Sequence, residues 1–207
     1  MRQPFRVLFV CTGNMCRSPL AERLTRASLA RTGTAGIDAS SAGTHAVVGA
    51  PMHPDSAVVL QRLGGDPAGF IARQLTMRLV DNADLILAAA RPHREIVGAW
   101  CPDATTRTFT LREFAALAAA VPRGGISQLD DPAGRARALT AAAAPLRGQL
   151  AAWPRGRLDV GDPVGRPMAM HEATARAIAE ALAGPLNLLA GTPGGFAGAA
   201  GSPEGVT

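Results

Sequence analysis

The sequence predicts a single α/β domain in three layers, in which a four-stranded parallel, twisted sheet is flanked by helices. Short apolar runs alternate with longer segments at helical spacing, which is typical of βαβ units. The first run, Phe5 to Val10, is almost continuously apolar, as expected of a parallel strand covered on both faces. The 207 residues are enough for one such domain with a proper core and few for two.

Strands are expected where apolar, β-prone residues lie between turn residues. In chain order they are Phe5–Val10, Ile37–Ala42, Asp84–Ala88 and Arg107–Phe109. Helices are expected where apolar residues recur every three or four positions. The first is Pro19–Arg31, and the second follows the turn Gly49–Asp55 and runs to about Leu63. The others are Arg91–Ala99, Leu111–Ala120, Ala133–Trp153 and Met168–Leu189.

Proline and glycine modify the helices near the C-terminus. Pro145 and Gly148 are expected to split the helix predicted over Ala133–Trp153, because proline lacks a backbone N–H. The pair Gly184-Pro185 is expected to kink or interrupt the last helix. Residues 122–129 are predicted to form a loop. The domain is therefore expected over residues 1–190, and residues 191–207, which are rich in glycine and proline, are predicted to be a disordered tail.

The composition limits the classes of protein to which the chain can belong. The net charge is +5, but all the basic residues are arginine, they are spread along the chain, and aromatic residues make up only 4%. A nucleic-acid partner is therefore not expected, because basic patches with interleaved aromatic residues are missing. Arginine without lysine, together with abundant alanine and glycine, indicates a bacterial genome rich in GC.

The expected location is the cytoplasm. No apolar run approaches the length of a membrane span, and no charged-then-apolar leader precedes the first strand, so no membrane association is expected. The three cysteines, an odd number with two of them in one short loop, argue against a secreted disulfide framework. We expect a monomer or a weak dimer.

The most informative stretch follows the first strand directly: Cys11-Thr12-Gly13-Asn14-Met15-Cys16-Arg17-Ser18-Pro19. Ser18 and Pro19 are typical of a helix start, with serine as the cap. A strand, a short loop and a helix N-terminus form an anion site, because free N–H groups converge there and the helix dipole adds positive potential. Such a site favours the reactive thiolate of Cys11 at neutral pH, and Arg17 supplies a fork for two phosphate oxygens.

The spacing Cys-x5-Arg is short enough for the intervening amides to surround one tetrahedral oxyanion. It predicts a phosphate-binding loop and the chemistry of a cysteine phosphatase. The alternative is that Cys11 is an inert buried thiol at the end of a strand, since free cysteine is often buried.

This stretch, followed by Ala21-Glu22, resembles the signature of the low-molecular-weight protein-tyrosine phosphatases. The resemblance implies that Cys11 and Arg17 are catalytic. It also implies that a serine, Ser40 or Ser41, hydrogen-bonds Asn14, and that Arg73 has a structural role near the site. The residues that it assigns to substrate binding are Thr12, Gly13, Asn14, Met15, Cys16 and Ser18.

Two aspartates compete for the role of general acid, which must give a proton to the leaving group. Asp131 and Asp162 each precede a proline, which biases the aspartate toward an extended conformation. Asp131 opens a predicted helix, and a role as N-cap explains it fully. Asp162 lies in a loop before the last helix and resembles the family's Asp-x-x-Asp-Pro element, so Asp162 is the expected acid. Val164-Gly165 stands where the family commonly has an aromatic residue, which makes strict preference for phosphotyrosine uncertain.

The expected mechanism forms a phosphocysteine on Cys11 and then hydrolyses it, with a phosphorylated protein or a small phosphomonoester as substrate. No cofactor and no metal is expected, because His45, His53, His93 and His171 show no metal-ligand spacing in the sequence. Cys16 is expected to form a reversible disulfide with Cys11 under peroxide.

Two other functions fit the same loop. A thiol-dependent arsenate reductase would need two further redox cysteines downstream, where Cys101 is alone. A non-catalytic module that binds phosphorylated ligands would need neither the thiolate of Cys11 nor the acid Asp162.

Overall fold

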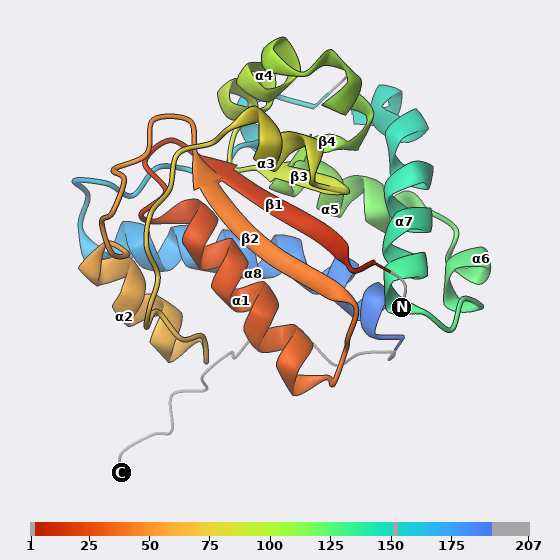
Figure 1. The fold of residues 1–207 in the computed structure, drawn as a ribbon, viewed down its shortest axis with the longest axis horizontal. Helices are drawn as coiled ribbons and strands as arrows, with labels where there is room; N and C mark the ends of the chain where they lie inside the picture. The colour runs from red at the N-terminus through yellow and green to blue at the C-terminus, as the bar shows by residue number, and fades with distance from the viewer. Residues whose placement is uncertain (1–2, 151–152, 192–207) are drawn as a thin grey trace.

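The computed structural model describes residues 3–150 and 153–191, and these residues form the predicted parallel sheet with helices on both faces (Figure 1). The strands lie in the order β2-β1-β3-β4 and all pairs are parallel. Because β1 lies between β2 and β3, the segment that leaves its carboxyl end lies at the point where the strand order reverses, which is where α/β sheets bind ligands. The bounds are β1 Phe5–Cys11, β2 Ile37–Gly43, β3 Leu85–Ala88 and β4 Thr108–Thr110.

Side chains of β1 alternate between two cores. Phe5, Val7 and Phe9 point into the larger core, and Leu8 and Val10 point into the smaller one on the opposite face. All five are at most 5% exposed. Both faces of the strand are therefore covered, which explains why the sequence shows a continuous apolar run instead of an alternation.

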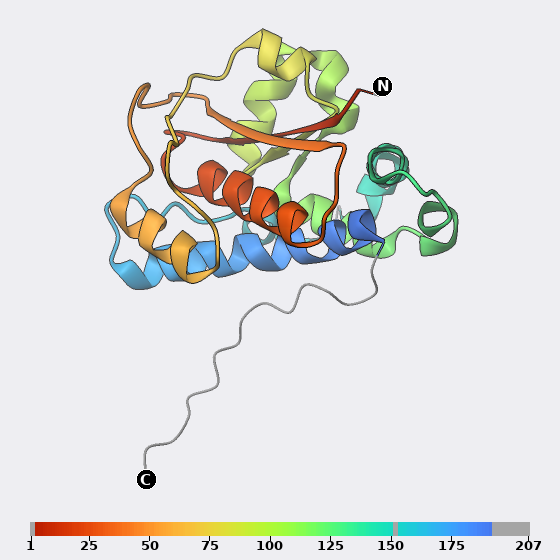
Figure 2. The same ribbon diagram turned by 60° about the horizontal axis from the view of Figure 1, so that its bottom comes forward.

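The helices on the two faces differ in number and length. The larger core is closed by long helices that include α1, α5 and α8, and Figure 2 shows α8 running beneath α1 along the length of the sheet. The smaller core is closed by α3 and α4. The bounds are α1 Arg17–Arg31, α2 Pro54–Arg62, α3 Met77–Asp81, α4 Arg91–Trp100, α5 Leu111–Ala120, α6 Arg123–Ser127, α7 Pro132–Ala143 and α8 Met168–Ala190.

Short helices account for most of the errors in the sequence-based prediction. The prediction of a loop over residues 122–129 is wrong, because α6 begins at Arg123 and ends at Ser127. The helix α3 and the 3-10 helices Pro102–Arg107 and Arg155–Leu158 were also not predicted. Segments of four to six residues cover one turn or little more, so no periodic pattern can distinguish them from a turn.

Proline has opposite effects at two places. The helix predicted over Ala133–Trp153 in fact ends at Ala143 and continues as a 3-10 helix over Ala144–Leu150, so the split expected near Pro145 is present. The interruption expected at Pro185 is absent, since α8 is continuous from Met168 to Ala190. Pro185 is on the buried face of α8, where packing against the core outweighs the missing hydrogen bond.

The described part of the chain closes with the end of α8. This helix ends at Ala190, and the positive φ of 70° at Gly191 gives the left-handed C-cap typical of glycine. The predicted tail lies outside the described residues, apart from Gly191. Within residues 3–150 and 153–191, no helix is both long and apolar enough to cross a membrane.

One buried arginine holds the far end of α8. The guanidinium of Arg135 donates to the carbonyl of Leu189 over 2.9 and 2.6 Å, and to the carbonyls of Leu129 and Asp130 over 2.6 and 3.2 Å. We expect Arg135→Met to lower the free energy of unfolding by about 2–4 kcal/mol, because it leaves the carbonyl of the buried Leu189 without its two donors and releases the carbonyls of Leu129 and Asp130. Urea denaturation followed by circular dichroism measures this loss.

The matched control is Arg137→Met, because Arg137 makes a single 3.2 Å hydrogen bond to Gln3 from an exposed position. We expect this variant to lose less than about 1 kcal/mol. Equal losses in the two variants would contradict the role assigned to Arg135.

Candidate functional site

The loop predicted to bind phosphate joins β1 to α1. Cys11 is the last residue of β1, and Cys16 is the N-cap residue of α1, which begins at Arg17. The prediction that Ser18 caps the helix is therefore wrong. Ser18 is in the first turn, where its hydroxyl lies 2.9 Å from the sulfur of Cys11 instead of facing a backbone N–H. Cys11 and Ser18 are both buried.

The shape of the loop depends on one unusual backbone conformation and one close approach. Asn14 has a positive φ of 55°, the left-handed region that asparagine tolerates better than most residues. Gly43, at the end of β2, passes so near the loop that a Cβ there would lie 2.4 Å from the carbonyl oxygen of Thr12. A side chain at position 43 would therefore displace the loop.

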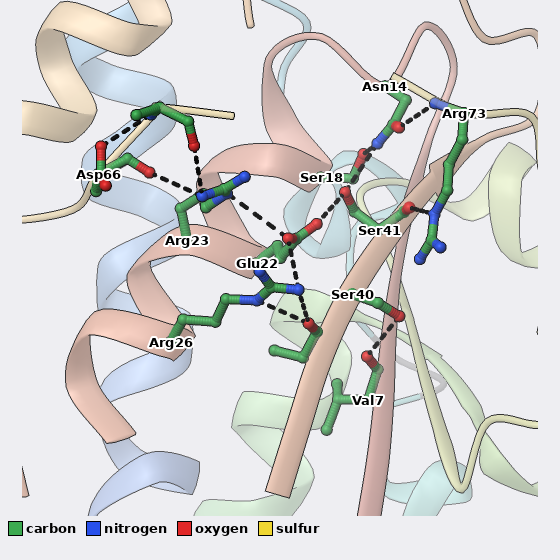
Figure 3. Close-up of polar contacts among 12 residues, drawn as sticks. Val7, Asn14, Ser18, Glu22, Arg23, Arg26, Ser40, Ser41, Asp66 and Arg73 are labelled. Carbon is green, nitrogen blue, oxygen red and sulfur yellow. Dashed lines mark hydrogen bonds and ion pairs between the residues drawn. The ribbon is translucent and has the colours of Figure 1, made fainter. Parts of the chain in front are cut away.

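Asn14 is held by three hydrogen bonds of its side chain (Figure 3). Its amide nitrogen donates to the hydroxyls of Ser18 and Ser41, both over 2.9 Å. Its carbonyl oxygen accepts from the backbone N–H of Arg73 over 2.9 Å. The predicted hydrogen bond between a serine and Asn14 is thus confirmed for Ser41, which accepts it. Ser40 makes a different bond, to the carbonyl of Val7 over 3.4 Å.

These bonds continue into a buried chain that gives each hydroxyl a direction. Ser41 donates to the carboxylate of Glu22 over 2.6 Å, so its oxygen is left to accept from Asn14. Ser18 likewise accepts from Asn14, so its own hydrogen can point at the sulfur of Cys11 over 2.9 Å or at the carbonyl of Ala42 over 3.5 Å. The amide nitrogen of Asn14 can only donate and the carboxylate of Glu22 can only accept, so both hydroxyls accept from Asn14, and Ser41 gives its own hydrogen to Glu22. The nearer acceptor for the Ser18 hydrogen is the sulfur of Cys11.

Three arginines contact residues of this hydrogen-bond network. Glu22 is buried, and its carboxylate lies 3.1 Å from the guanidinium of Arg26 and 3.6 Å from that of Arg23. The positive charges offset the cost of burying the carboxylate. Arg73 donates from Nε to the carbonyl of Ser41 over 2.7 Å (Figure 3). The structural role predicted for Arg73 is therefore confirmed.

Arg17 and Asp162 meet above the loop. Arg17 is 6% exposed, and its Nη2 lies 2.5 Å from Oδ2 of Asp162. The same guanidinium donates to the hydroxyl of Thr12 and to the carbonyl of Val160, each over 3.4 Å. The Asp162 side chain is 47% exposed, so it can turn between Arg17 and a bound ligand.

Hydrogen bonds to the segment after β3 and to α8 hold the segment that carries Asp162. Asp159 accepts from the N–H of Arg91 over 2.8 Å, and the N–H of Val160 donates to Ala89 over 2.7 Å. Thr174 of α8 donates to the carbonyl of Gly161 over 3.3 Å. These hydrogen bonds hold the segment so that the carboxylate of Asp162 lies at the loop.

The competing aspartate lies elsewhere. Asp131 is the N-cap of α7, where its carboxylate accepts from the N–H groups of Ala133 and Gly134 over 3.2 and 3.0 Å. Ala133 lies beside Gly36, which precedes β2. Asp131 is thus at the amino ends of the strands, opposite to the loop, and the predicted capping role is confirmed.

The sequence did not indicate His93, which is buried under the loop. Its Nε2 lies 2.9 Å from the hydroxyl of Thr12. Burial, and after it the positive charge of Arg17, lowers the pKa of His93 to about 4. The imidazole is therefore neutral at neutral pH and can hold Thr12 without adding charge to the site. His93 comes from the first turn of α4, so only the fold brings it to Thr12.

A second cluster of side chains lies around Cys16, at the end of the loop. One ligand atom each of Cys16, His53 and His171 lies within 4.8 Å of the others. Burial raises the pKa of the Cys16 thiol to about 11, although a hydrogen bond with Ser56 acts in the opposite direction. Burial lowers the pKa of His171. The sequence spacing did not show this cluster, because its members come from three separate elements.

Comparisons with known proteins agree with this geometry. A model of the family described as low molecular weight phosphotyrosine protein phosphatase matches residues 6–138. A protein-arginine-phosphatase of Geobacillus stearothermophilus is 36% identical over 111 residues, which are 54% of this chain and 72% of that protein. The low molecular weight protein-tyrosine-phosphatase Etp of Escherichia coli (strain K12) is 39% identical over 108 residues, 52% of this chain and 70% of that protein.

The fold is likewise shared with solved structures. A low molecular weight protein tyrosine phosphatase from T. tengcongensis is 28% identical, with a TM-score of 0.62 over 89% of this chain and 97% of that chain.

The hydrogen bonds beneath the loop predict an effect of Asn14→Asp on Cys11. The aspartate carboxylate can only accept, so it draws the hydrogen of Ser18 away from the sulfur. We expect alkylation of Cys11 by iodoacetate at pH 6 to slow several-fold, measured by peptide mass spectrometry. Asn82→Asp, at an exposed position, is the control and should react like the wild type. An unchanged rate in Asn14→Asp would contradict the directing role of the Asn14 amide.

His93 predicts a loss of stability in acid. Its pKa is about 4 in the folded protein and about 6.5 unfolded, so between these values the unfolded chain binds more protons. The free energy of unfolding should therefore fall as the pH falls from 7 to 4.5, by about 2 kcal/mol from this group. Urea titrations across this range should show a smaller fall for His93→Gln than for the wild type. The exposed His45 supplies the control, since His45→Gln should keep the full pH dependence.

Proposed function

The chain belongs to the low molecular weight phosphotyrosine protein phosphatase family, whose members named protein-tyrosine phosphatases are phosphoric monoester hydrolases, and we propose that it acts through a phosphocysteine on Cys11. One observation carries the proposal: the Ser18 hydroxyl, which accepts from Asn14 and can donate to the sulfur, lies 2.9 Å from Cys11, and Arg17 and Asp162 meet above the same loop. A sulfur held in this way is suited to be the nucleophile, and the loop is suited to hold a phosphate.

In the first step, the thiolate of Cys11 attacks phosphorus in line with the leaving oxygen. The P–S bond forms as the P–O bond to the leaving group breaks. Arg17 and the backbone amides of Thr12 to Arg17 hold the other oxygens and stabilise their charge. Asp162, which enters the step protonated, gives its proton to the leaving oxygen.

In the second step, water cleaves phosphocysteine. Asp162, now a carboxylate, takes a proton from water as the water oxygen attacks phosphorus, and the P–S bond breaks. Ser18 donates to the sulfur as its negative charge returns. Both steps use only side chains and amides of this chain, together with one water.

The substrate is proposed to be phosphotyrosine in a protein or a related phosphomonoester. Two exposed valines lie near the site: Val164 is two residues after Asp162, and Val47 lies beside Gly13. Each is more than half exposed, and together they offer apolar surface against which a ring can pack. Phosphoarginine is the second candidate, because a relative that is 36% identical is a protein-arginine-phosphatase. Asp162 would then protonate a leaving nitrogen.

Other parts of the description stay predictions from the sequence. These are the cytoplasmic location, the bacterial source, the absence of a nucleic-acid partner and the monomeric or weakly dimeric state. The arsenate-reductase alternative lacks its two downstream cysteines, because Cys101 is the sole cysteine after the loop. A binding module needs no acid, so the contact of Asp162 with Arg17 favours the enzyme.

Hydrolysis of para-nitrophenyl phosphate, followed across pH without added metal, tests this proposal. We expect Cys11→Ser to abolish turnover and Asp162→Asn to lower kcat by roughly 10²- to 10⁴-fold, the usual contribution of a general acid. Asp131→Asn should leave kcat unchanged, because asparagine also caps a helix and Asp131 is at the opposite end of the sheet.

Two results would change the assignment. An inactive wild type that still binds phosphate would identify a binding module. Full activity in Asp162→Asn would remove the acid role from Asp162. Comparison of kcat/KM for a phosphotyrosine peptide and a phosphoarginine peptide then decides between the two substrates.

A further inference from the structure

We propose that Cys16, His53 and His171 form a binding site for one zinc ion. They come from three elements: Cys16 precedes α1, His53 is the N-cap of α2, and His171 is in the first turn of α8. In Figure 2 the start of α8 lies beside α2, beneath the end of α1 that carries the loop. A cysteine and two histidines are ligands that zinc prefers.

One nitrogen of His171 makes no hydrogen bond of normal geometry. The side chain is fully buried, and its Nε2 has no hydrogen-bond partner among the described residues, although contact with the backbone of Pro163 partly opposes the lowering of the imidazole pKa by burial. A buried polar atom without a partner is costly, and native proteins rarely leave one. The nearest charged atom to it among the printed ion pairs is Oδ2 of Asp55, at 3.7 Å, which is too far for a hydrogen bond. A cation in the cluster would satisfy this nitrogen.

Ser56 interacts with two of the proposed ligands, His171 and Cys16. Its hydroxyl is fully buried, lies 2.9 Å from Nδ1 of His171 and also hydrogen-bonds the thiol of Cys16. When Nδ1 of His171 donates to Ser56, the lone pair of the imidazole is on Nε2, the unpartnered atom. The serine hydrogen is then free to donate to the Cys16 sulfur. This is the kind of support that metal-bound histidines receive from neighbouring groups.

The electrostatics of the cluster suit a divalent cation. The carboxylate of Asp55 lies 4.0 Å from Nδ1 of His53 and 3.7 Å from Nε2 of His171. The two imidazoles stack with their centroids 4.7 Å apart. On binding, zinc replaces the proton of the Cys16 thiol, which leaves to solvent, so that Zn²⁺ is held by one thiolate and two neutral imidazoles. The fourth position is open to water or to Asp55.

The ligand atoms need only a small movement. In a tetrahedral zinc site the ligand atoms are roughly 3.4–3.6 Å apart, and here they lie within 4.8 Å of one another. The His53 side chain is 26% exposed and can turn toward the other two, which breaks the 3.3 Å hydrogen bond that its Nδ1 accepts from the N–H of Asp55. Bound zinc would tie the loop to α2 and α8, in addition to the hydrogen bond from the N–H of His53 to the carbonyl of Met15.

Cobalt is the probe for this site, because a thiolate bound to Co²⁺ gives an intense charge-transfer absorption. We use the full chain with Cys11→Ser and Cys101→Ser, in which Cys16 is the sole thiol. We expect one Co²⁺ per chain, the thiolate absorption, displacement by one Zn²⁺, and a rise in melting temperature with added zinc. The wild type should show the same behaviour.

Variants of single ligands decide the outcome. We expect His53→Gln to weaken Co²⁺ binding by at least about 10-fold and Ser56→Ala to weaken it to a similar or smaller extent. His45→Gln, at an exposed histidine outside the cluster, should bind like its parent. Cys16→Ser in the otherwise wild-type chain should lose the absorption. His53 is partly exposed, so its replacement tests the site even if variants at the fully buried His171 do not fold.

Two results would overturn the proposal. One is the absence of a thiolate–cobalt absorption in the chain that keeps only Cys16. The other is an absorption in the wild type that survives Cys16→Ser and disappears with Cys11→Ser, which would mean that the metal binds the nucleophile. The proposal does not depend on the proposed phosphatase activity, since every readout is binding, absorption or stability.

Discussion

The side-chain amide of Asn14 makes three hydrogen bonds, and the form of the loop after β1 depends on them. Asn14 adopts a left-handed backbone conformation that the surroundings must stabilise, and its amide bonds to Ser18, Ser41 and the N–H of Arg73. These partners belong to α1, to β2 and to the segment after α2. The loop is therefore held from three directions, and the sulfur of Cys11 and the guanidinium of Arg17 are positioned without a ligand.

Charge is arranged in two layers around this loop. Below it, Glu22 is the acceptor at the end of the hydrogen-bond chain, and Arg26 offsets its burial. Above it, Arg17 faces Asp162, whose half-exposed side chain can move. Hydrogen-bonded groups therefore lie beside the sulfur, and a half-exposed carboxylate lies opposite Arg17. This division suits the transfer of a phosphoryl group to a thiolate that we propose.

The last third of the chain completes the site. The family model matches residues 6–138, whereas Asp162 and the whole of α8 lie beyond that range. The helix α8 spans the larger core, and near its beginning Thr174 supports the backbone that carries Asp162, while His171 meets Cys16 and His53. Packing of α8 on α1 and α5 thus connects the hydrophobic core with both the loop and the cluster beside it.

The sequence by itself determined the parallel sheet, because strands buried on both faces need continuous apolar runs such as Phe5 to Val10. It also determined the loop, since a cysteine, a glycine-asparagine pair and an arginine at short spacing are local features. The choice of Asp162 over Asp131 came from the capping position of Asp131 and from the family resemblance around Asp162, and the structure places Asp162 at the loop and Asp131 at the opposite end. Ser41 could not be separated from Ser40, because which of two adjacent side chains faces the loop depends on the register of β2 against β1.

Only the tertiary structure decided the contacts between distant segments. His93 meets Thr12 from α4, Glu22 reaches Ser41 across the space between α1 and β2, and His171 meets Cys16 from a helix more than 150 positions away. No periodicity records such pairs, because they arise from how helices pack on a sheet and not from the spacing of residues along one element. The same reason explains Pro185, whose local preference to interrupt a helix is outweighed by burial that the sequence around it does not reveal.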